Sequence, residues 1–202
     1  MESTTVTHTT AHGTLTETVQ AGPHTDVVVL APHGGSIEPQ TAAQAQQLAS
    51  RIDCPVWFCR GETRTDRSAF SEFHIASHKL TAEQFPTVQQ IIDTEPSLAV
   101  SIHGMKESGV YIGGRITRTL QEELRSVLRQ RLPDSVPVEI HNRGSYAGVL
   151  RSNIVNRVTT SGNHGLQLEQ GWDVRHRHTD VCPQAVADVL TTAVTGSATT
   201  GR

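Results

Sequence analysis

Apolar, β-branched runs alternate along this chain with segments whose apolar positions recur every three or four residues. The runs predict buried strands, and they lie at 27–31, 55–59, 98–102, 110–112, 136–140 and 166–169. The helical spacing predicts helices at 41–52, 81–93, 118–132 and 184–194. Because continuous apolar strands alternate with helices, the pattern predicts an α/β fold with a mixed, largely parallel sheet and helices on both faces.

The two ends of the chain lack this pattern. Residues 1–13 and 195–202 are rich in threonine and poor in apolar residues, which predicts flexible tails around a single domain at 14–194. The first residues carry neither the basic start nor the apolar core of a signal peptide, and no apolar run approaches membrane-spanning length. We therefore expect a cytoplasmic protein without a membrane partner, although release by cell lysis would leave no mark in the sequence.

Composition excludes several classes of protein. The net charge is −3, with no clustered basic segment, so the sequence gives no electrostatic case for a nucleic-acid partner. The three cysteines are an odd number without C-x-x-C spacing, which argues against a disulfide framework and against a thiolate zinc site. We expect a monomer or a small homo-oligomer.

Histidines directly follow two of the predicted strands. His33 ends the first apolar run and is followed by two glycines and then Glu38, while His103 ends the run at 98–102. Ligands of α/β sheets bind beyond the carboxyl ends of the strands, so these side chains are expected to share a site. The glycines allow a turn that folds Glu38 back beside His33. Three protein ligands with one open position are typical of catalytic zinc; the alternative is a turn histidine and a solvated acid.

Glu169 lies within the apolar run at 166–169. The run alternates, so Leu166 and Leu168 face one way while Gln167 and Glu169 face the other. Glu169 points either to water on an edge strand or over the metal as a general base, and the alternation is consistent with both.

Several segments with these residues occur in an order that resembles a known family. They are Ala31-Pro32-His33-Gly34-Gly35-Ser36-Ile37-Glu38-Pro39, Phe73-His74-Ile75-Ala76-Ser77, Ser101-Ile102-His103-Gly104, Tyr111-Ile112-Gly113-Gly114, Asn153-Ile154-Val155-Asn156-Arg157 and Gly165-Leu166-Gln167-Leu168-Glu169. Over about 27–171 the chain resembles the poly-γ-glutamate hydrolases of bacteriophages, bacteria and archaea. The resemblance implies a Zn²⁺-dependent amidohydrolase with a fold similar to zinc carboxypeptidases. It also implies that His33, Glu38 and His103 are the zinc ligands and that Glu169 is the general base.

Other polar residues are weaker candidates. An arginine fork suits the α-carboxylate of a glutamate, so Arg115 and Arg157 are predicted to contact substrate; a plain surface role is the alternative for each. His74 and Asn153 are further candidates for substrate contacts. The tract at 175–178, in which arginine alternates with histidine, is predicted to be a solvated loop.

The sequence therefore favours a zinc hydrolase that cleaves γ-glutamyl amide bonds in a glutamate-containing polymer or peptide. Two alternatives keep the zinc and change the substrate: an N-acyl amino acid deacylase and a peptidoglycan γ-D-glutamyl peptidase. An alternative from another class is a non-catalytic, phage-associated binding protein, which would act without a metal.

Overall fold

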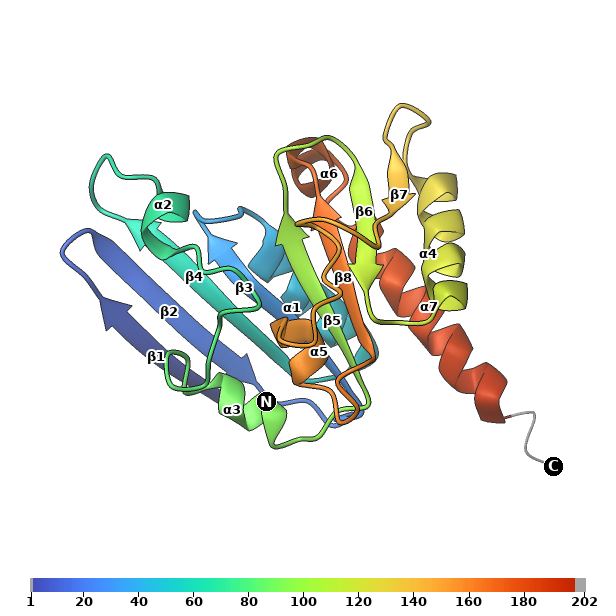
Figure 1. The fold of residues 1–202 in the computed structure, drawn as a ribbon, viewed down its shortest axis with the longest axis horizontal. Helices are drawn as coiled ribbons and strands as arrows, with labels where there is room; N and C mark the ends of the chain where they lie inside the picture. The colour runs from blue at the N-terminus through green and yellow to red at the C-terminus, as the bar shows by residue number, and fades with distance from the viewer. Residues whose placement is uncertain (1, 199–202) are drawn as a thin grey trace.

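One mixed sheet organises the computed structural model, which describes residues 2–198 (Figure 1). The strands are β1 Ser3–Thr9, β2 Gly13–Gln20, β3 Val27–Gly35, β4 Val56–Thr63, β5 Leu98–Gly104, β6 Val110–Gly114, β7 Val138–Ile140 and β8 Gly165–Gln170. The helices are α1 Thr41–Ile52, α2 Ala69–Phe73, α3 Val88–Ile92, α4 Arg118–Arg131, α5 Ile154–Arg157, α6 Trp172–Arg177 and α7 Val181–Ala198. Across the sheet the strand order is β1-β2-β4-β3-β5-β8-β6-β7.

The centre of this sheet is parallel. Strand β3 pairs with β4 and β5, and β5 pairs with β8, all in parallel, and β6 pairs in parallel with β7. The pairs β1–β2, β2–β4 and β6–β8 are antiparallel. The predicted mixed, largely parallel sheet is thus confirmed. Because β3, β5 and β8 run in one direction, their carboxyl ends meet at one edge of the sheet.

Helices cover both faces of the sheet, as predicted. Figure 1 shows α1, α4 and α7 behind the sheet and α2, α3 and α5 in front of it. The rear face packs alternate strand residues such as Ile102 and Leu168 against the rear helices. The front face packs Val28, Leu30 and Trp57 against the front helices. The alternation of side chains along each strand therefore supplies two separate apolar layers.

The first residues of the chain depart from the prediction of a tail without regular structure. Strand β1 pairs along its whole length with β2, and alternate residues of β1 are partly buried. Threonine fits this role because its β-branched side chain favours strands, and Thr5 and Thr18 share a hydrogen bond across the pair (3.1 Å). At the other end, the predicted tail at 195–202 overlaps α7, which continues to Ala198; residues 199–202 lie outside the described part of the chain.

Two further segments differ from the predictions. The helix expected at 81–93 is restricted to α3, because Pro86 disfavours helical backbone at the residue before it. Thr87 is held instead by the buried Glu17 carboxylate, to which its N–H (3.0 Å) and hydroxyl (2.6 Å) both donate. The tract at 175–178, predicted to be a loop, begins within α6.

No helix in the described range 2–198 is long and apolar enough to cross a membrane. The three cysteines are free and buried, and burial raises the pKa values of Cys54 and Cys182 to about 12. Their thiols therefore stay protonated at neutral pH and belong to the core rather than to a reactive site.

Candidate active site

The pairing between β3 and β4 is irregular next to His33. The parallel register between β3 and β4 shifts between Ala31 and Gly34, at the point where Pro32 has no N–H to contribute. Gly35 then adopts a φ of +68°, and a Cβ there would lie 2.9 Å from the backbone nitrogen of Gly61. The N–H of Glu38 closes the turn by donating to the carbonyl of His33 (2.7 Å). The turn therefore brings Glu38 back over His33, as predicted.

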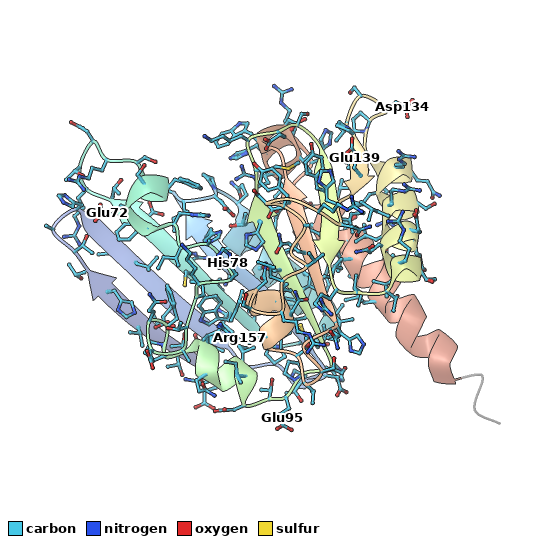
Figure 2. The ribbon with its side chains drawn as sticks, in the orientation of Figure 1. Glu72, His78, Glu95, Asp134, Glu139 and Arg157 are labelled. Carbon is cyan, nitrogen blue, oxygen red and sulfur yellow. The ribbon has the colours of Figure 1, made fainter. Side chains whose placement is uncertain are left out.

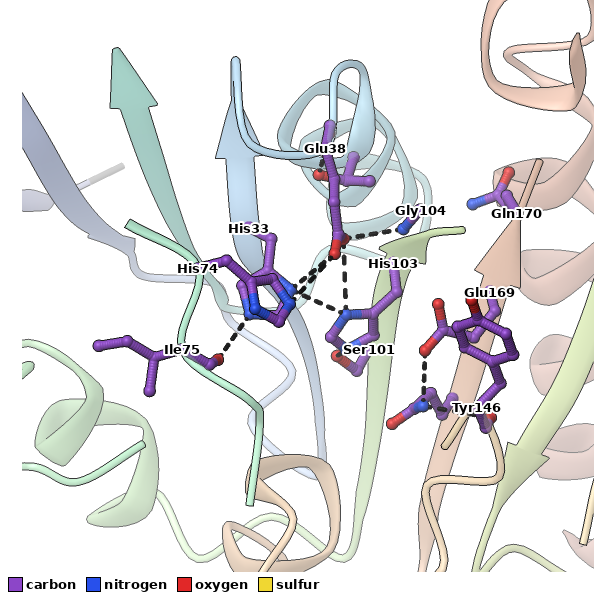
Figure 3. Close-up of polar contacts among 12 residues, drawn as sticks. His33, Glu38, His74, Ile75, Ser101, His103, Gly104, Tyr146, Glu169 and Gln170 are labelled. Carbon is purple, nitrogen blue, oxygen red and sulfur yellow. Dashed lines mark hydrogen bonds and ion pairs between the residues drawn. The ribbon is translucent and has the colours of Figure 1, made fainter. Parts of the chain in front are cut away.

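The two side chains of this turn face each other. Nδ1 of His33 lies 3.0 Å from Oε1 of Glu38, and both side chains are almost fully buried. On the other side of its ring, His33 donates from Nε2 to the carbonyl of Ile75 (2.8 Å), as Figure 3 shows. A carbonyl only accepts, so Nε2 carries the proton and Nδ1 of a neutral His33 presents its lone pair to the carboxylate.

His103 joins the pair from the end of β5. Its Nδ1 lies 3.2 Å from Nδ1 of His33 and 3.6 Å from Oε2 of Glu38. Its Nε2 lies 2.8 Å from the hydroxyl of Ser101, which is buried on the same face of β5. The N–H of Gly104 donates to Glu38 Oε2 (2.8 Å) and fixes the carboxylate between the two histidines (Figure 3).

Three lone-pair donors thus converge on one small, buried volume. Burial lowers the pKa of His103. At His33 burial also acts to lower the pKa, but the Glu38 carboxylate and the Ile75 carbonyl together outweigh it and raise the pKa. Burial would raise the pKa of Glu38, but the two histidines hold it well below its usual range. The arrangement therefore favours a positive charge at its centre. A divalent cation with a preference for imidazole and carboxylate ligands fits this donor set, and Zn²⁺ has that preference.

His74 lies beside this group, directly after α2. Its ring centroid is 4.2 Å from that of His33, and its Nε2 is 3.8 Å from Glu38 Oε1. Ligand atoms of His33, Glu38 and His74 all lie within 4.8 Å of one another, so His74 is an alternative third ligand to His103. His103 is the more buried of the two histidines, and its ring is oriented by Ser101. His74 is half-buried and stacks on Phe70, and burial lowers its pKa to about 4.

Glu169 lies next to His103 across the β5–β8 ladder, where the two residues are partners. Its Oε1 accepts a hydrogen bond from Nε2 of Gln167 (2.9 Å), and Gln167 in turn accepts one from Asn153 (2.9 Å). Burial, followed by the charge of Glu38, raises the pKa of Glu169 well above its usual value. A carboxylate in such a place is a stronger base than one in water, because protonation removes a buried charge.

Arg175 is the site residue that the sequence analysis missed. Its side chain is buried and lines one pocket together with Glu38 and Glu169. Burial lowers the pKa of Arg175, and the negative charges of Glu38 and Glu169 oppose this effect. Nε donates to the carbonyl of Gln170 (3.1 Å), and Nη1 donates to that of Pro39 (2.6 Å). One guanidinium thus joins the residues that directly follow Glu169 and Glu38.

Two of the predicted substrate contacts lie elsewhere. Arg115 donates to Asn163 (2.9 Å) and to the carbonyl of Val149 (3.1 Å), and Arg157 donates to the carbonyl of Leu80 (2.6 Å). Figure 2 shows Arg157 close to α5, away from the carboxyl ends of β3 and β5. Neither arginine lines the pocket, because each guanidinium is used to hold a loop.

The remaining candidates share one pocket of about 920 Å³. His33, Glu38, His74, His103, Asn153, Glu169 and Arg175 all line it. This volume is within the usual range for a small-molecule or peptide site, and it combines a metal-binding donor set with a perturbed carboxylate.

Most of the chain matches one protein family. The family profile of poly-gamma-glutamate hydrolase aligns with residues 5–182. The chain belongs to the poly-gamma-glutamate hydrolase family. Members of the family hydrolyse amide bonds, so this protein is a hydrolase that acts on amide bonds.

Solved structures share the fold of this poly-gamma-glutamate hydrolase family member. A bacteriophage poly-gamma-glutamate hydrolase has a TM-score of 0.69 at 20% identity, with 93% of this chain and 92% of that chain covered. The zinc-free apo form of YndL has a TM-score of 0.65 at 21% identity, with coverage of 96% and 90%. A gene product of Agrobacterium tumefaciens has a TM-score of 0.57 at 13% identity, with coverage of 89% and 95%. No curated protein is significantly similar in sequence.

Proposed function

We propose that this protein is a zinc-dependent hydrolase that cleaves γ-glutamyl amide bonds. The observation that carries the proposal is the convergence of two Nδ1 atoms and one carboxylate beside a second, buried carboxylate with a raised pKa. Metal-dependent hydrolases need these two parts, a cation site and a base, within one pocket.

His33, Glu38 and His103 are the proposed residues that would hold the metal. The choice of zinc is supported by the donor types and by the similar fold of YndL, whose solved apo form is distinguished as zinc-free. When bound, zinc would act as a Lewis acid on the amide carbonyl and make the attacking water more acidic. The carbonyl of Ile75 and the hydroxyl of Ser101 hold the two rings so that Nδ1 of each faces the metal position.

Glu169 is the proposed general base. Its carboxylate takes a proton from the attacking water and then delivers it to the departing amide nitrogen. Gln167 orients Glu169 through the hydrogen bond to Oε1, and Asn153 orients Gln167. This chain of amides keeps the carboxylate directed at the pocket without supplying a positive charge that would weaken it as a base.

The γ-glutamyl substrate is inferred from the family, whose name specifies that linkage. His74 and Asn153 line the pocket near the proposed metal position and remain the candidates for polar substrate contacts. The positive side chains that could pair with the α-carboxylate of the glutamyl unit are Lys106 and Arg175, rather than Arg115 and Arg157.

Metal analysis combined with a substrate panel tests this proposal. Purified protein is expected to hold one zinc per chain and to release amine from poly-γ-glutamate or γ-glutamyl dipeptides. A chelator should abolish that release, and added zinc should restore it. N-acyl glutamate and muropeptides serve as comparison substrates. Zinc-loaded protein that hydrolyses one of these comparison substrates but no γ-glutamyl compound would overturn the proposed substrate, and chelator-resistant hydrolysis would overturn the metal.

A further inference from the structure

The two edges of the sheet differ in length and in chemistry. Strand β7 has three residues, directly follows Pro137 and contains Glu139. A short strand beside a proline and a charge is a common way to keep a sheet edge from pairing with another chain. Strand β1 has seven residues, and it contains no proline, glycine, lysine, arginine or carboxylate. Figure 1 shows β1 as the outermost strand on its side of the sheet, and no strand within residues 2–198 pairs with its other edge.

Alternate residues of β1 direct their backbone polar groups away from β2. At one end of the pairing the N–H of Ala21 donates to the carbonyl of Glu2 (2.9 Å), and at the other end that of Thr10 donates to Gly13 (2.9 Å). In an antiparallel pair, residues bonded to the neighbouring strand alternate with residues whose N–H and C=O point outward. Even-numbered residues of β1 therefore bond to β2, and odd-numbered residues face the free edge. The outward residues are Ser3, Thr5, Thr7 and Thr9.

The side chains of β1 also suit pairing with another strand. Threonine is β-branched and favours strands, and Thr5 already shares a hydrogen bond with Thr18 across the β1–β2 pair (3.1 Å). The ionisable side chain of β1 is His8, whose Nε2 lies 3.2 Å from the Glu17 carboxylate within the same copy. The free edge therefore carries little charge that would repel a second, identical edge.

We propose that β1 pairs with β1 of a second copy of this chain, in an antiparallel two-fold dimer that extends the sheet across both copies. The register that fits is centred on Val6, which then lies opposite Val6 of the copy. Thr5 lies opposite Thr7 of the copy and Ser3 opposite Thr9, so every outward N–H meets a carbonyl. A shift by one residue would set outward groups against residues that already bond to β2. The proposal does not depend on the catalytic function proposed above.

Sedimentation equilibrium of the purified protein tests the dimer. We expect a mass that rises with concentration toward twice that of the 21.9-kDa chain. A monomer at every concentration up to about 0.5 mM would overturn the proposal, because even weak interfaces are partly occupied there.

Thr5→Pro locates the interface. The substitution removes one outward N–H from each copy but leaves the β1–β2 hydrogen bonds intact, because that N–H does not face β2. Two lost hydrogen bonds per dimer should raise Kd by about tenfold or more. Thr5→Val is the matched control, since it keeps the N–H and the β-branch, and it should change Kd by less than about threefold. A dimer of unchanged Kd in folded Thr5→Pro would show that another surface joins the copies.

Val6→Cys tests the register and stands even if Thr5→Pro does not fold. Directly opposed residues that are not hydrogen-bonded have Cα atoms about 4.5 Å apart, which a disulfide can bridge. With oxidised glutathione as the electron acceptor, V6C should form a covalent dimer on non-reducing electrophoresis; the native thiols are buried. Thr4→Cys should stay monomeric there, because the two Thr4 residues would be about 14 Å apart. No cross-link in V6C, or equal cross-linking in both variants, would overturn the proposed pairing.

Discussion

Neighbouring residues on the two faces of β5 and β8 are buried to a similar extent, but they are apolar on one face and polar on the other. On the rear face, Ile102 and Leu168 are fully buried against apolar helices. On the front face, the next residues along the chain, His103 and Glu169, are 3% and 6% exposed. Burial of the apolar pair stabilises the fold, whereas burial of the polar pair lowers the pKa of His103 and raises that of Glu169. Equal exclusion from water thus produces an apolar core on the rear face and the candidate active site on the front face.

Glu169→Gln is the sharpest test of the proposed general base on the front face. The amide has nearly the same shape but cannot accept the proton of the attacking water, so kcat should fall by about 10³-fold or more. Zinc content should stay at the wild-type level, because Glu169 is not a proposed ligand. Steady-state kinetics and elemental analysis on one preparation give both values. A variant with more than a tenth of wild-type kcat would remove Glu169 from the role of base.

His103→Ala and Leu168→Ala change residues on opposite faces of the two strands, and their effects should separate. Loss of His103 removes a proposed ligand, so zinc content and hydrolysis should both fall to background. Loss of the Leu168 side chain should lower the free energy of unfolding by about 2–5 kcal/mol. The folded fraction of L168A should still bind zinc.

Denaturant unfolding and metal analysis of both variants provide the measurement. Full zinc occupancy in H103A would show that His103 lies at the site but is not a zinc ligand. In that case His74 would be the remaining candidate for the third position.

Arg175→Gln tests the residue that links the two acid-bearing segments. The carbonyls of Pro39 and Gln170 would lose their shared hydrogen bonds to the guanidinium, so Glu38 and Glu169 should lose their relative alignment. We expect kcat to fall by about 10- to 100-fold with a smaller change in KM, and Arg175→Lys to restore only part of it. A change confined to KM would indicate instead that Arg175 mainly binds the substrate carboxylate.

The smallest expected effect concerns stability of the metal-free protein. His33 has a raised pKa in the folded protein. Its contribution to the free energy of unfolding is therefore complete below its ordinary pKa of 6.5 and disappears as pH rises through the raised value. Glu38 has a lowered pKa, so its contribution is present above 4.5 and disappears as pH falls through the lowered value. With chelator present, the difference in Tm between wild type and Glu38→Gln should be largest between pH 4.5 and pH 6.5, the ordinary pKa values of the two groups. The difference should shrink toward alkaline pH. A difference that grows above pH 8 would contradict this.

Strong periodicity is the part of the fold that the sequence predicts well. The helix at 41–52 is found with those bounds, because its apolar residues recur at helical spacing and face the sheet. His33, Glu38 and His103 are found together because the two histidines lie near the carboxyl ends of the neighbouring parallel strands β3 and β5 and the turn after β3 brings Glu38 back to them. Local pattern was sufficient in these cases.

Long-range contacts account for what the sequence analysis missed. Strand β1 is polar at most positions and becomes a strand only by pairing with β2. Arg175 lies in a short helix with no apolar period, and its partners Pro39 and Gln170 are set by the tertiary fold. The one feature of the sequence that could have pointed to Arg175 is Gly104, because a Cβ there would lie 2.5 Å from the Arg175 guanidinium carbon. A glycine directly after a predicted ligand can therefore mark a place where another side chain must fit.

Anomalous X-ray scattering at the zinc edge, from crystals of the zinc-loaded protein, tests the central claim most directly. We expect one strong peak per chain, bonded to Nδ1 of His33, Nδ1 of His103 and the Glu38 carboxylate at about 2.0–2.2 Å. A peak at another position, or its absence from this trio in fully zinc-loaded crystals, would contradict the proposed metal centre and the mechanism built on it.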